Sequence, residues 1–287
     1  MDKLRGLVAL EMIPALRKLA AAPAGAALIC AIVAAPQATA AGFYARPAPH
    51  ARAHPRAQAD SKDTGNLQGY SPAAKRVLAQ ARAASGGAGW SLLRGWHETG
   101  HQGGAKYESW SDTLRYGMRV ETRDAAGLSA RGFNGQGAWR IQPSGAAAGV
   151  EERALVAQAR TEAFLGAYGF FYSGRFDAHG EYLGVRQLRG RSFDVITVHP
   201  WDGTPRELWF DGASHLLARI VDRSGPQAVT TELSDYRKVG PIKAAFHVTI
   251  EGATPGGAQD IKVDSIVFTS AEREMFSLPR PGAPAQP

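Results

Sequence analysis

Cysteine is almost absent from this chain, whose 287 residues include only Cys30. That residue lies in an apolar run near the N-terminus, and the residue before it is not the small one that bacterial lipidation signals use. If the run is removed on export, the mature protein contains no thiol. Disulfides, cysteine-ligated zinc, iron–sulfur clusters and cysteine nucleophiles are then excluded for the mature form.

A large excess of one charge is also lacking. The whole chain has a formal net charge of +7, from 33 Lys and Arg against 26 Asp and Glu. Residues 71–287 alone hold 25 basic and 22 acidic residues, a balance of +3, with the acids interspersed among the bases. Because so small an excess is not typical of a nucleic-acid-binding surface, we expect no nucleic acid among the partners.

The N-terminal segment has the order of a secretory signal peptide. Four basic residues come before and at the start of an apolar run, Leu19 to Ala35, which the small residues Ala38-Thr39-Ala40-Ala41 follow. A proline and a glycine interrupt the run, whereas a membrane span needs about 20 predominantly apolar residues, so cleavage is favoured over a retained anchor. The sequence therefore predicts a signal peptide over residues 1–40, cleaved near Ala40-Ala41, and a periplasmic mature protein. Met12 is an alternative start that changes nothing downstream.

Composition divides the rest of the chain into a linker, one domain and a tail. Residues 41–70 contain almost no large aliphatic side chain, which predicts a disordered linker. Ser71-Pro72 supplies an N-cap and a first-turn proline for a helix at Ala73 to Ala84. Residues 276–287 are rich in proline and are expected to be disordered. One domain is thus predicted over residues 71–275.

From Trp90 onward the apolar pattern has the period of two that is typical of strands. Four tight-turn dipeptides separate the alternating runs and predict hairpins: Asn134-Gly135, Asp202-Gly203, Asp211-Gly212 and Ser224-Gly225. Strands are expected near 90–100, 105–111, 114–123, 127–133 and 138–142, and, after a helix at 151–168, near 181–189, 192–199, 205–210, 215–222, 227–236, 245–252 and 260–269. This order predicts a mostly β (α+β) fold with a large antiparallel sheet curled around helices.

One segment matches a catalytic motif letter for letter. His97-Glu98-Thr99-Gly100-His101 fits the H-E-x-x-H pattern of zinc proteases, which needs a helix so that residues four apart share one face. Glycines crowd this segment, and on a strand the two histidines would lie about 13 Å apart. We interpret the match as chance, and a zinc-dependent hydrolase is the least favoured function.

The other polar candidates are weaker still. Asp63-Thr64-Gly65 spells the aspartic-protease triplet but falls in the predicted linker, away from any apolar strand. The remaining histidines of the domain, His179, His199, His215 and His247, are isolated in the sequence and are interpreted as structural or surface residues. We therefore expect no catalytic residue, no metal ligand and no cofactor.

Aromatic and other large apolar side chains are the best candidates for ligand contacts. Core packing explains any one of them, yet a curled sheet of this size can also enclose an apolar cavity. The candidate cavity-lining residues lie on the predicted strands and the second helix: Trp96, Trp110, Tyr116, Met118, Trp139, Phe164, Tyr168 and Trp209.

Several stretches resemble one family. The segment Gly132 to Trp139 is similar to the DG-x-x-x-W hairpin of the LolA/LolB-like superfamily, the bacterial outer-membrane lipoprotein-sorting proteins and their relatives. So are Glu207 to Asp211, Leu216 to Asp222 and Ser234 to Gly240. The resemblance covers roughly residues 72–270 and implies an incomplete β-barrel closed by helices. The chain also resembles the domain found ahead of some retropepsin-like aspartic proteases.

The resemblance implies a function in the cell envelope. It favours a periplasmic binding or carrier domain for an apolar ligand, a lipid or the acyl chain of a lipoprotein, with transient contact to the inner or outer membrane surface. The alternative is a non-catalytic interaction domain whose barrel is filled by its own side chains. Fold alone does not decide between them.

Overall fold

The computed structural model describes residues 69–172, 174–254, 257–270 and 272–279. The expected signal peptide, nearly all of the expected linker and the end of the expected tail lie outside the described residues. Within the described part of the chain, no helix is both long and apolar enough to cross a membrane.

The elements alternate between a few helices and many strands. The helices are α1 (Pro72–Ser85) and α2 (Arg153–Gly166), with short 3₁₀ helices η1 (Gly87–Leu92), η2 (Gly169–Phe171) and η3 (Arg273–Phe276). Six strands lie between η1 and α2: β1 (Gly95–Gln102), β2 (Ala105–Asp112), β3 (Gly117–Asp124), β4 (Gly127–Asn134), β5 (Ala138–Ile141) and β6 (Ala147–Val150). Eight come after α2: β7 (Ala178–His179), β8 (Tyr182–Leu188), β9 (Arg191–Pro200), β10 (Arg206–Asp211), β11 (Leu217–Asp222), β12 (Val229–Val239), β13 (Ile242–Thr254) and β14 (Gly257–Phe268).

All these strands belong to one antiparallel sheet that does not close. Its order is β6-β5-β4-β3-β2-β1-β14-β13-β12-β11-β10-β9-β7, and β8 also pairs with β9. The pairing of β1 with β14 joins the strands before α2 to those after it. Strand β6 lies at one end of the sheet and β7 and β8 at the other, with no pairing between the two ends. The expected mostly β fold with a large, incomplete barrel is confirmed.

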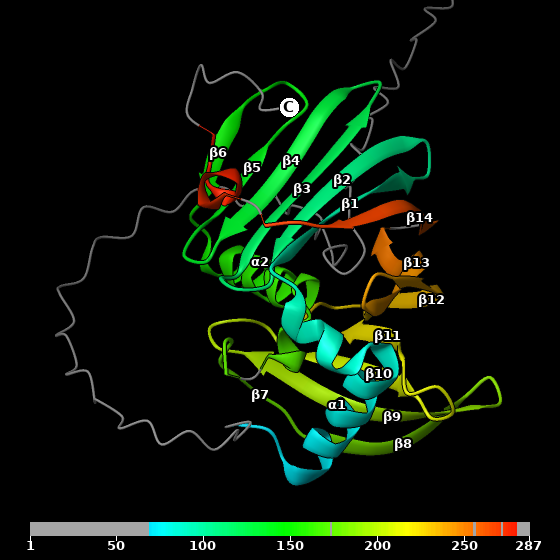
Figure 1. The fold of residues 1–287 in the computed structure, drawn as a ribbon. Coiled ribbons are helices and arrows are strands. Elements are labelled where there is room, and N and C mark those ends of the chain that lie inside the picture. The colour runs from blue at the N-terminus through cyan, green and yellow to red at the C-terminus, as the bar shows by residue number, and fades with distance from the viewer. Residues whose placement is uncertain (1–68, 173, 255–256, 271, 280–287) are drawn as a thin grey trace, which may run out of the picture.

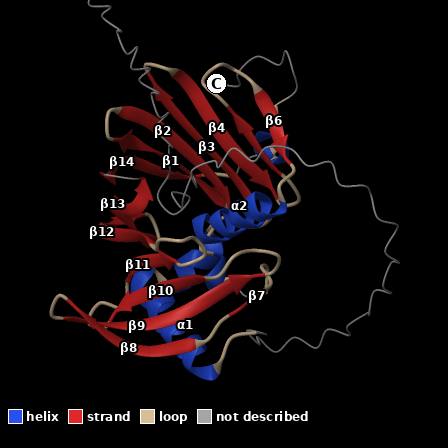
Figure 2. Cartoon of the chain, turned by 180° about the vertical axis from the view of Figure 1, so that it is seen from behind, coloured by secondary structure: helices blue, strands red, loops and turns tan. Residues whose placement is uncertain are grey.

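Helices α1 and α2 lie on the inner side of the curved sheet (Figures 1 and 2). Helix α2 lies between the two parts of the sheet, because it contacts β3, β4 and β5 on one side and β9 on the other. Helix α1 packs against β9 and β13. This arrangement makes α2 the element that spans the opening of the sheet.

Asn and Asp side chains form the hairpin turns that the sequence predicts. Asn134 Oδ1 accepts hydrogen bonds from the backbone N–H groups of residues 136 and 137 in the β4–β5 hairpin. In the same way, the carboxylate of Asp211 accepts a backbone N–H group in the β10–β11 hairpin, and that of Asp222 accepts one in the β11–β12 hairpin. Asp202 turns the β9–β10 hairpin with a φ of 53°, in the left-handed region that Asp and Asn tolerate best after glycine. Short-range side-chain hydrogen bonds thus fix the register of the sheet.

The first helix also forms as its sequence predicts. Ser71 caps α1 by accepting a hydrogen bond from Ala74 N at 3.4 Å, and Pro72 occupies the first turn. Its buried residues follow helical spacing on one face, and the helix ends at Gly86 with a φ of 148°. The burial of this face holds α1 against the sheet.

Some boundaries differ from the expectation. The first strand begins at Gly95 rather than near Trp90, because the preceding residues form η1, which packs tightly under the β12–β13 turn. A Cβ at Gly89 would lie 2.5 Å from the carbonyl oxygen of Pro241, so only glycine permits this approach. Strands β6 and β7 were not expected; they are short and carry little of the apolar alternation by which strands are predicted.

The packed part of the domain is longer at both ends than the predicted 71–275. Tyr70, expected in the linker, is buried, and its backbone bridges to Gly180. Phe276, expected in the tail, is buried with its ring over Gly117. Each ring covers a glycine that leaves room for it, a long-range contact that composition does not reveal.

Candidate ligand-binding site

The inner face of the sheet and the helices enclose one large apolar cluster. Of the eight candidate residues, Trp96, Met118, Phe164 and Tyr168 are buried within it, and Tyr116 is half-buried against it. They come from β1, β3, α2, the residues just after α2 and the β2–β3 turn. The structure therefore brings five predicted residues to one interior.

Aromatic rings in this cluster touch one another. The Tyr168 ring lies 5.3 Å from that of Trp96 and 4.7 Å from that of Trp90, centroid to centroid. Tyr116 makes an edge contact with Phe176 at 4.5 Å. Such tilted and edge-on pairs stabilise by about 0.5–1.5 kcal/mol beyond the area they bury. Trp90 and Phe176 are not among the residues expected from the sequence, because both lie in short segments without the clear period of a strand or an α-helix.

The other three candidates, Trp110, Trp139 and Trp209, lie on the opposite, outer face. In β2 the inward residues are Tyr107 and Ser109, so the pleat directs Trp110 outward. In β10 the inward positions are taken by buried residues on either side of Trp209. The expectation that all eight residues line one cavity is therefore wrong for these three.

The outward aromatics form a ladder across neighbouring strands. Trp110 stacks on His97 at 4.6 Å with ring planes 3° apart. The Arg119 guanidinium lies 5.9 Å from the Trp110 ring and 5.6 Å from the Trp139 ring. Trp139 Nε1 in turn donates to the carbonyl oxygen of Phe276 at 2.7 Å. This ladder binds the C-terminal 3₁₀ helix to the outer face, a structural task that explains these tryptophans without a ligand.

The H-E-x-x-H segment lies on a strand, β1, as predicted. His97 pairs with Glu108 at 2.9 Å, and His101 pairs with Asp264 at 2.9 Å, so the two imidazoles have different partners. Glu98 faces the other way, into the interior, where it accepts a hydrogen bond from the Tyr107 hydroxyl at 2.7 Å. In the described residues, no group of three His, Cys, Asp or Glu side chains is placed to hold a metal ion.

Tyr168 places a polar group in the apolar interior close to Glu98. Burial raises the pKa of Tyr168 well above its ordinary value, and the neighbouring Tyr236 and Glu98 raise it further. Its hydroxyl is buried without a hydrogen-bond partner among the residues that the structure describes. A neutral, buried hydroxyl of this kind is a ready donor for a polar group that enters the interior.

One buried ion pair joins α2 to the first part of the sheet, and another joins two strands of the second part. Glu162 on α2 accepts a hydrogen bond from Arg131 of β4 at 2.7 Å. On the other side, the fully buried Arg206 of β10 lies 2.7 Å from Asp222 of β11. Burial raises the pKa of Glu162 to about 7, although Arg131 and Arg206 both lower it. Burial likewise lowers the pKa of Arg206, against the opposing effect of Asp222.

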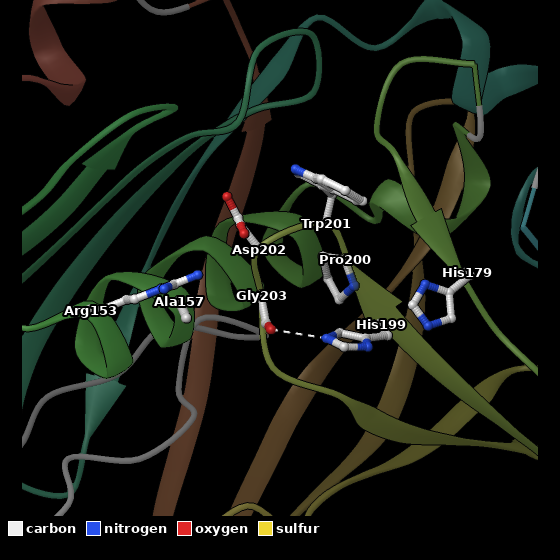
Figure 3. A pocket seen from close by; sticks show the side chains of 8 residues that line it. All are labelled: Arg153, Ala157, His179, His199, Pro200, Trp201, Asp202 and Gly203. Carbon is white, nitrogen blue, oxygen red and sulfur yellow. Dashed lines mark hydrogen bonds between the residues drawn. The ribbon is translucent and has the colours of Figure 1, made fainter. Parts of the chain in front are cut away.

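A separate pocket of about 320 Å³ lies between α2 and the end of the sheet (Figure 3). Its lining comes from α2, β7, β9 and the β9–β10 turn: Arg153, Ala157, His179, His199, Pro200, Trp201, Asp202 and Gly203. The rings of His179 and His199 lie 4.8 Å apart. These two histidines, which are far apart in the sequence, lie side by side because β7 and β9 pair them directly.

Comparisons with known proteins identify relatives by fold only. No family model and no curated protein matches this chain. It is similar to the solved structure of a LolA superfamily protein from Nitrosomonas europaea, with 13% identity and a TM-score of 0.49 over 71% of this chain and 97% of that chain. A DUF1329 family protein from Desulfovibrio piger matches with 12% identity and a TM-score of 0.48 over 72% of this chain and 98% of that one.

A third solved structure, an outer membrane lipoprotein-sorting protein domain from Vibrio parahaemolyticus, matches with 14% identity and a TM-score of 0.47 over 71% of this chain and 97% of that chain. At such identities the likeness concerns the fold alone. The likeness to the domain ahead of retropepsin-like proteases stays a prediction.

Proposed function

We propose that this chain is an exported carrier or binding domain for an apolar ligand, a lipid or the acyl chain of a lipoprotein, held between the inner face of the sheet and α2. The observation that carries the proposal is the continuous apolar interior of a sheet that does not close, spanned by one helix. Trp96, Met118, Phe164 and Tyr168 would contact the ligand, with Tyr116 at their edge. Export, and contact with the inner or outer membrane surface, belong to the same proposal.

The energetics of an acyl chain suit such an interior. Each CH₂ group that leaves water contributes about 0.8 kcal/mol, so a chain of about a dozen carbons offsets the cost of ordering it. No charged group is needed for this, and the buried Tyr168 hydroxyl supplies one hydrogen-bond donor for a polar end. For the ligand to enter, α2 has to move away from part of the sheet.

The second candidate is an envelope interaction domain whose interior is filled by its own side chains. The mutual ring contacts of Trp90, Trp96 and Tyr168 favour it, because they already occupy the space between helix and sheet. In this case the partner would bind an outer surface, and the interior would take up nothing.

Displacement of a neutral fluorescent long-chain fatty-acid ester discriminates the two candidates. The carrier proposal expects saturable binding of the probe and competition by unlabelled lipids. Phe164→Leu and Tyr168→Phe, which alter the inner face, should change the affinity, whereas Trp209→Phe on the outer face should leave it unchanged. Absence of saturable binding, or equal effects of inner and outer variants, would favour the interaction domain.

A further inference from the structure

A polar cluster lies at the edge of the apolar interior, where α2 meets the first part of the sheet. Arg160 of α2 is half-buried, and its guanidinium carbon lies 5.1 Å from the centre of the Phe133 ring and 5.8 Å from that of the Tyr116 ring. Within the described ranges, no carboxylate pairs with Arg160, and its Nε is buried without a hydrogen-bond partner. The two rings cover this cation, but its Nε–H group has no acceptor.

A second buried donor, the hydroxyl of Tyr70, reaches the same cluster from the other end of the sheet. The Tyr70 ring is buried over Gly180, which follows β7. Its hydroxyl makes no hydrogen bond in the part of the chain that the structure describes. Burial raises the pKa of Tyr70 well above its ordinary value, and the neighbouring Tyr116 raises it further, so the two phenols lie close enough to interact. The cluster thus combines side chains from α2, from the β2–β3 turn and from the segment before α1.

The cluster presents a cation and neutral hydroxyl donors. Burial raises the pKa of Tyr116 to about 12, although Arg160 lowers it and Asp177 raises it again. Both phenols therefore keep their protons at neutral pH, and the guanidinium keeps its charge. Asp177 is the carboxylate near this cluster, but it is exposed to solvent and does not pair with Arg160. An anion with acceptor oxygens is the chemical complement of such a group of donors.

The same cluster is continuous with the apolar interior. Arg160 and Phe164 are four residues apart on α2 and so lie on one face of the helix. The Tyr116 ring contacts both of them, because its centre lies 6.4 Å from that of the fully buried Phe164 ring. An amphiphile that lies along this face would place its head group at Arg160 and its apolar chain beside Phe164.

We propose that the ligand of this domain is a long-chain carboxylate, an ionised fatty acid, whose head group binds Arg160. This proposal rests on the carrier function proposed above. A guanidinium matches a planar carboxylate with two parallel N–H···O bonds, and the hydroxyls of Tyr70 and Tyr116 would donate to the same oxygens. An acyl chain in ester or amide linkage, as in a lipoprotein, carries no such charge and would gain nothing from Arg160.

Competition against the neutral ester probe at about pH 8, where a carboxylate is ionised, tests the proposal. The competitors are dodecanoate, methyl dodecanoate and dodecyl phosphate, each below the concentration at which it aggregates. Dodecanoate should bind the wild-type protein about tenfold more tightly than methyl dodecanoate, as expected for charge-assisted hydrogen bonds.

Variants assign this preference to the cluster. Arg160→Gln should remove the advantage of dodecanoate, and Arg160→Lys should keep part of it, because the charge remains without the planar fork. Tyr70→Phe should weaken dodecanoate by a smaller factor and leave methyl dodecanoate unchanged. Arg153→Gln changes an exposed arginine at the start of the same helix and is the matched control, which should bind both ligands as the wild type does.

Equal affinity of the wild-type protein for dodecanoate and methyl dodecanoate overturns the proposal, and this comparison needs no variant. Equal weakening of both ligands in a folded Arg160→Gln protein also overturns it, because the guanidinium then serves only to pack against the two rings. Arg160-dependent binding of dodecyl phosphate that is tighter than that of dodecanoate would contradict the assignment to a carboxylate. Failure of the carrier function is distinguishable, because in that case methyl dodecanoate does not bind either.

Discussion

The buried carboxyl of Glu162 gives the fold a measurable dependence on pH. Burial raises the pKa of Glu162 to about 7 in the folded protein, from an ordinary value of 4.5. Between these values the folded state keeps a proton that the unfolded state has released. Stability from this group is therefore fully present below about pH 4.5 and is lost as the pH rises through about 7.

The expected size follows from the same two values. One pKa unit corresponds to about 1.4 kcal/mol, so ionisation of Glu162 in the folded state lowers the free energy of unfolding by roughly 3 kcal/mol across this window. The cause is desolvation of a carboxylate that Arg131 compensates only in part. The loss should loosen α2, which spans the opening of the sheet.

Urea denaturation at a series of pH values from about 5 to about 8 measures this effect. The variant Glu162→Gln has no titrating group at the position, so the wild-type protein should lose stability relative to this variant as the pH rises. Glu152→Gln, which changes an exposed carboxylate at the start of the same helix, is the matched control and should follow the wild-type curve. Parallel curves for wild type and Glu162→Gln would refute the reasoning, as would a gain in wild-type stability at high pH.

Four further predictions concern the buried Arg206, the C-terminal segment, the H-E-x-x-H segment and export. Asp222→Ala should lower the free energy of unfolding by about 3–5 kcal/mol, because it removes the carboxylate that pairs with the buried Arg206 and that accepts the Ser224 backbone N–H group; a loss below about 1 kcal/mol would contradict this. Trp139→Phe removes the hydrogen bond to Phe276 and should cost about 1 kcal/mol and speed limited proteolysis near residue 276, while unchanged cleavage would show that this bond does not hold the segment. Elemental analysis should find no stoichiometric zinc, and one zinc per chain lost in His97→Ala would overturn the interpretation of the H-E-x-x-H match. Protein recovered from the periplasm should begin near Ala41, and recovery only from membranes with the leader intact would contradict export.

The hairpins and the first helix could be predicted from the sequence, because their turns and cap are formed by residues close together in the chain. Asn134 and Asp211 are each followed by glycine, and Asp222 comes two residues before Ser224-Gly225. Each of the three side chains accepts a backbone hydrogen bond within its own turn, so the hairpins are encoded by residues that are close together in the chain. The cap of α1 by Ser71 is local in the same sense.

The sequence does not predict which side chains face the interior of the sheet, or which residues line the pocket. Tyr107 and Trp110 differ by three positions and therefore point to opposite faces, but aromatic content alone does not show which of them is inward. The pairing of His179 with His199 requires a strand of only two residues to find its register on β9 across the chain. Such contacts depend on the assembled sheet, and no short segment encodes them.

Native mass spectrometry of protein purified from the periplasm without detergent tests most directly whether the apolar interior binds a lipid. The carrier proposal predicts a bound mass of lipid size that is reduced in Phe164→Leu and retained in Trp209→Phe. A ligand-free mass for the wild-type protein, with the same result after incubation with long-chain lipids, would contradict the proposal and leave the filled interaction domain in its place.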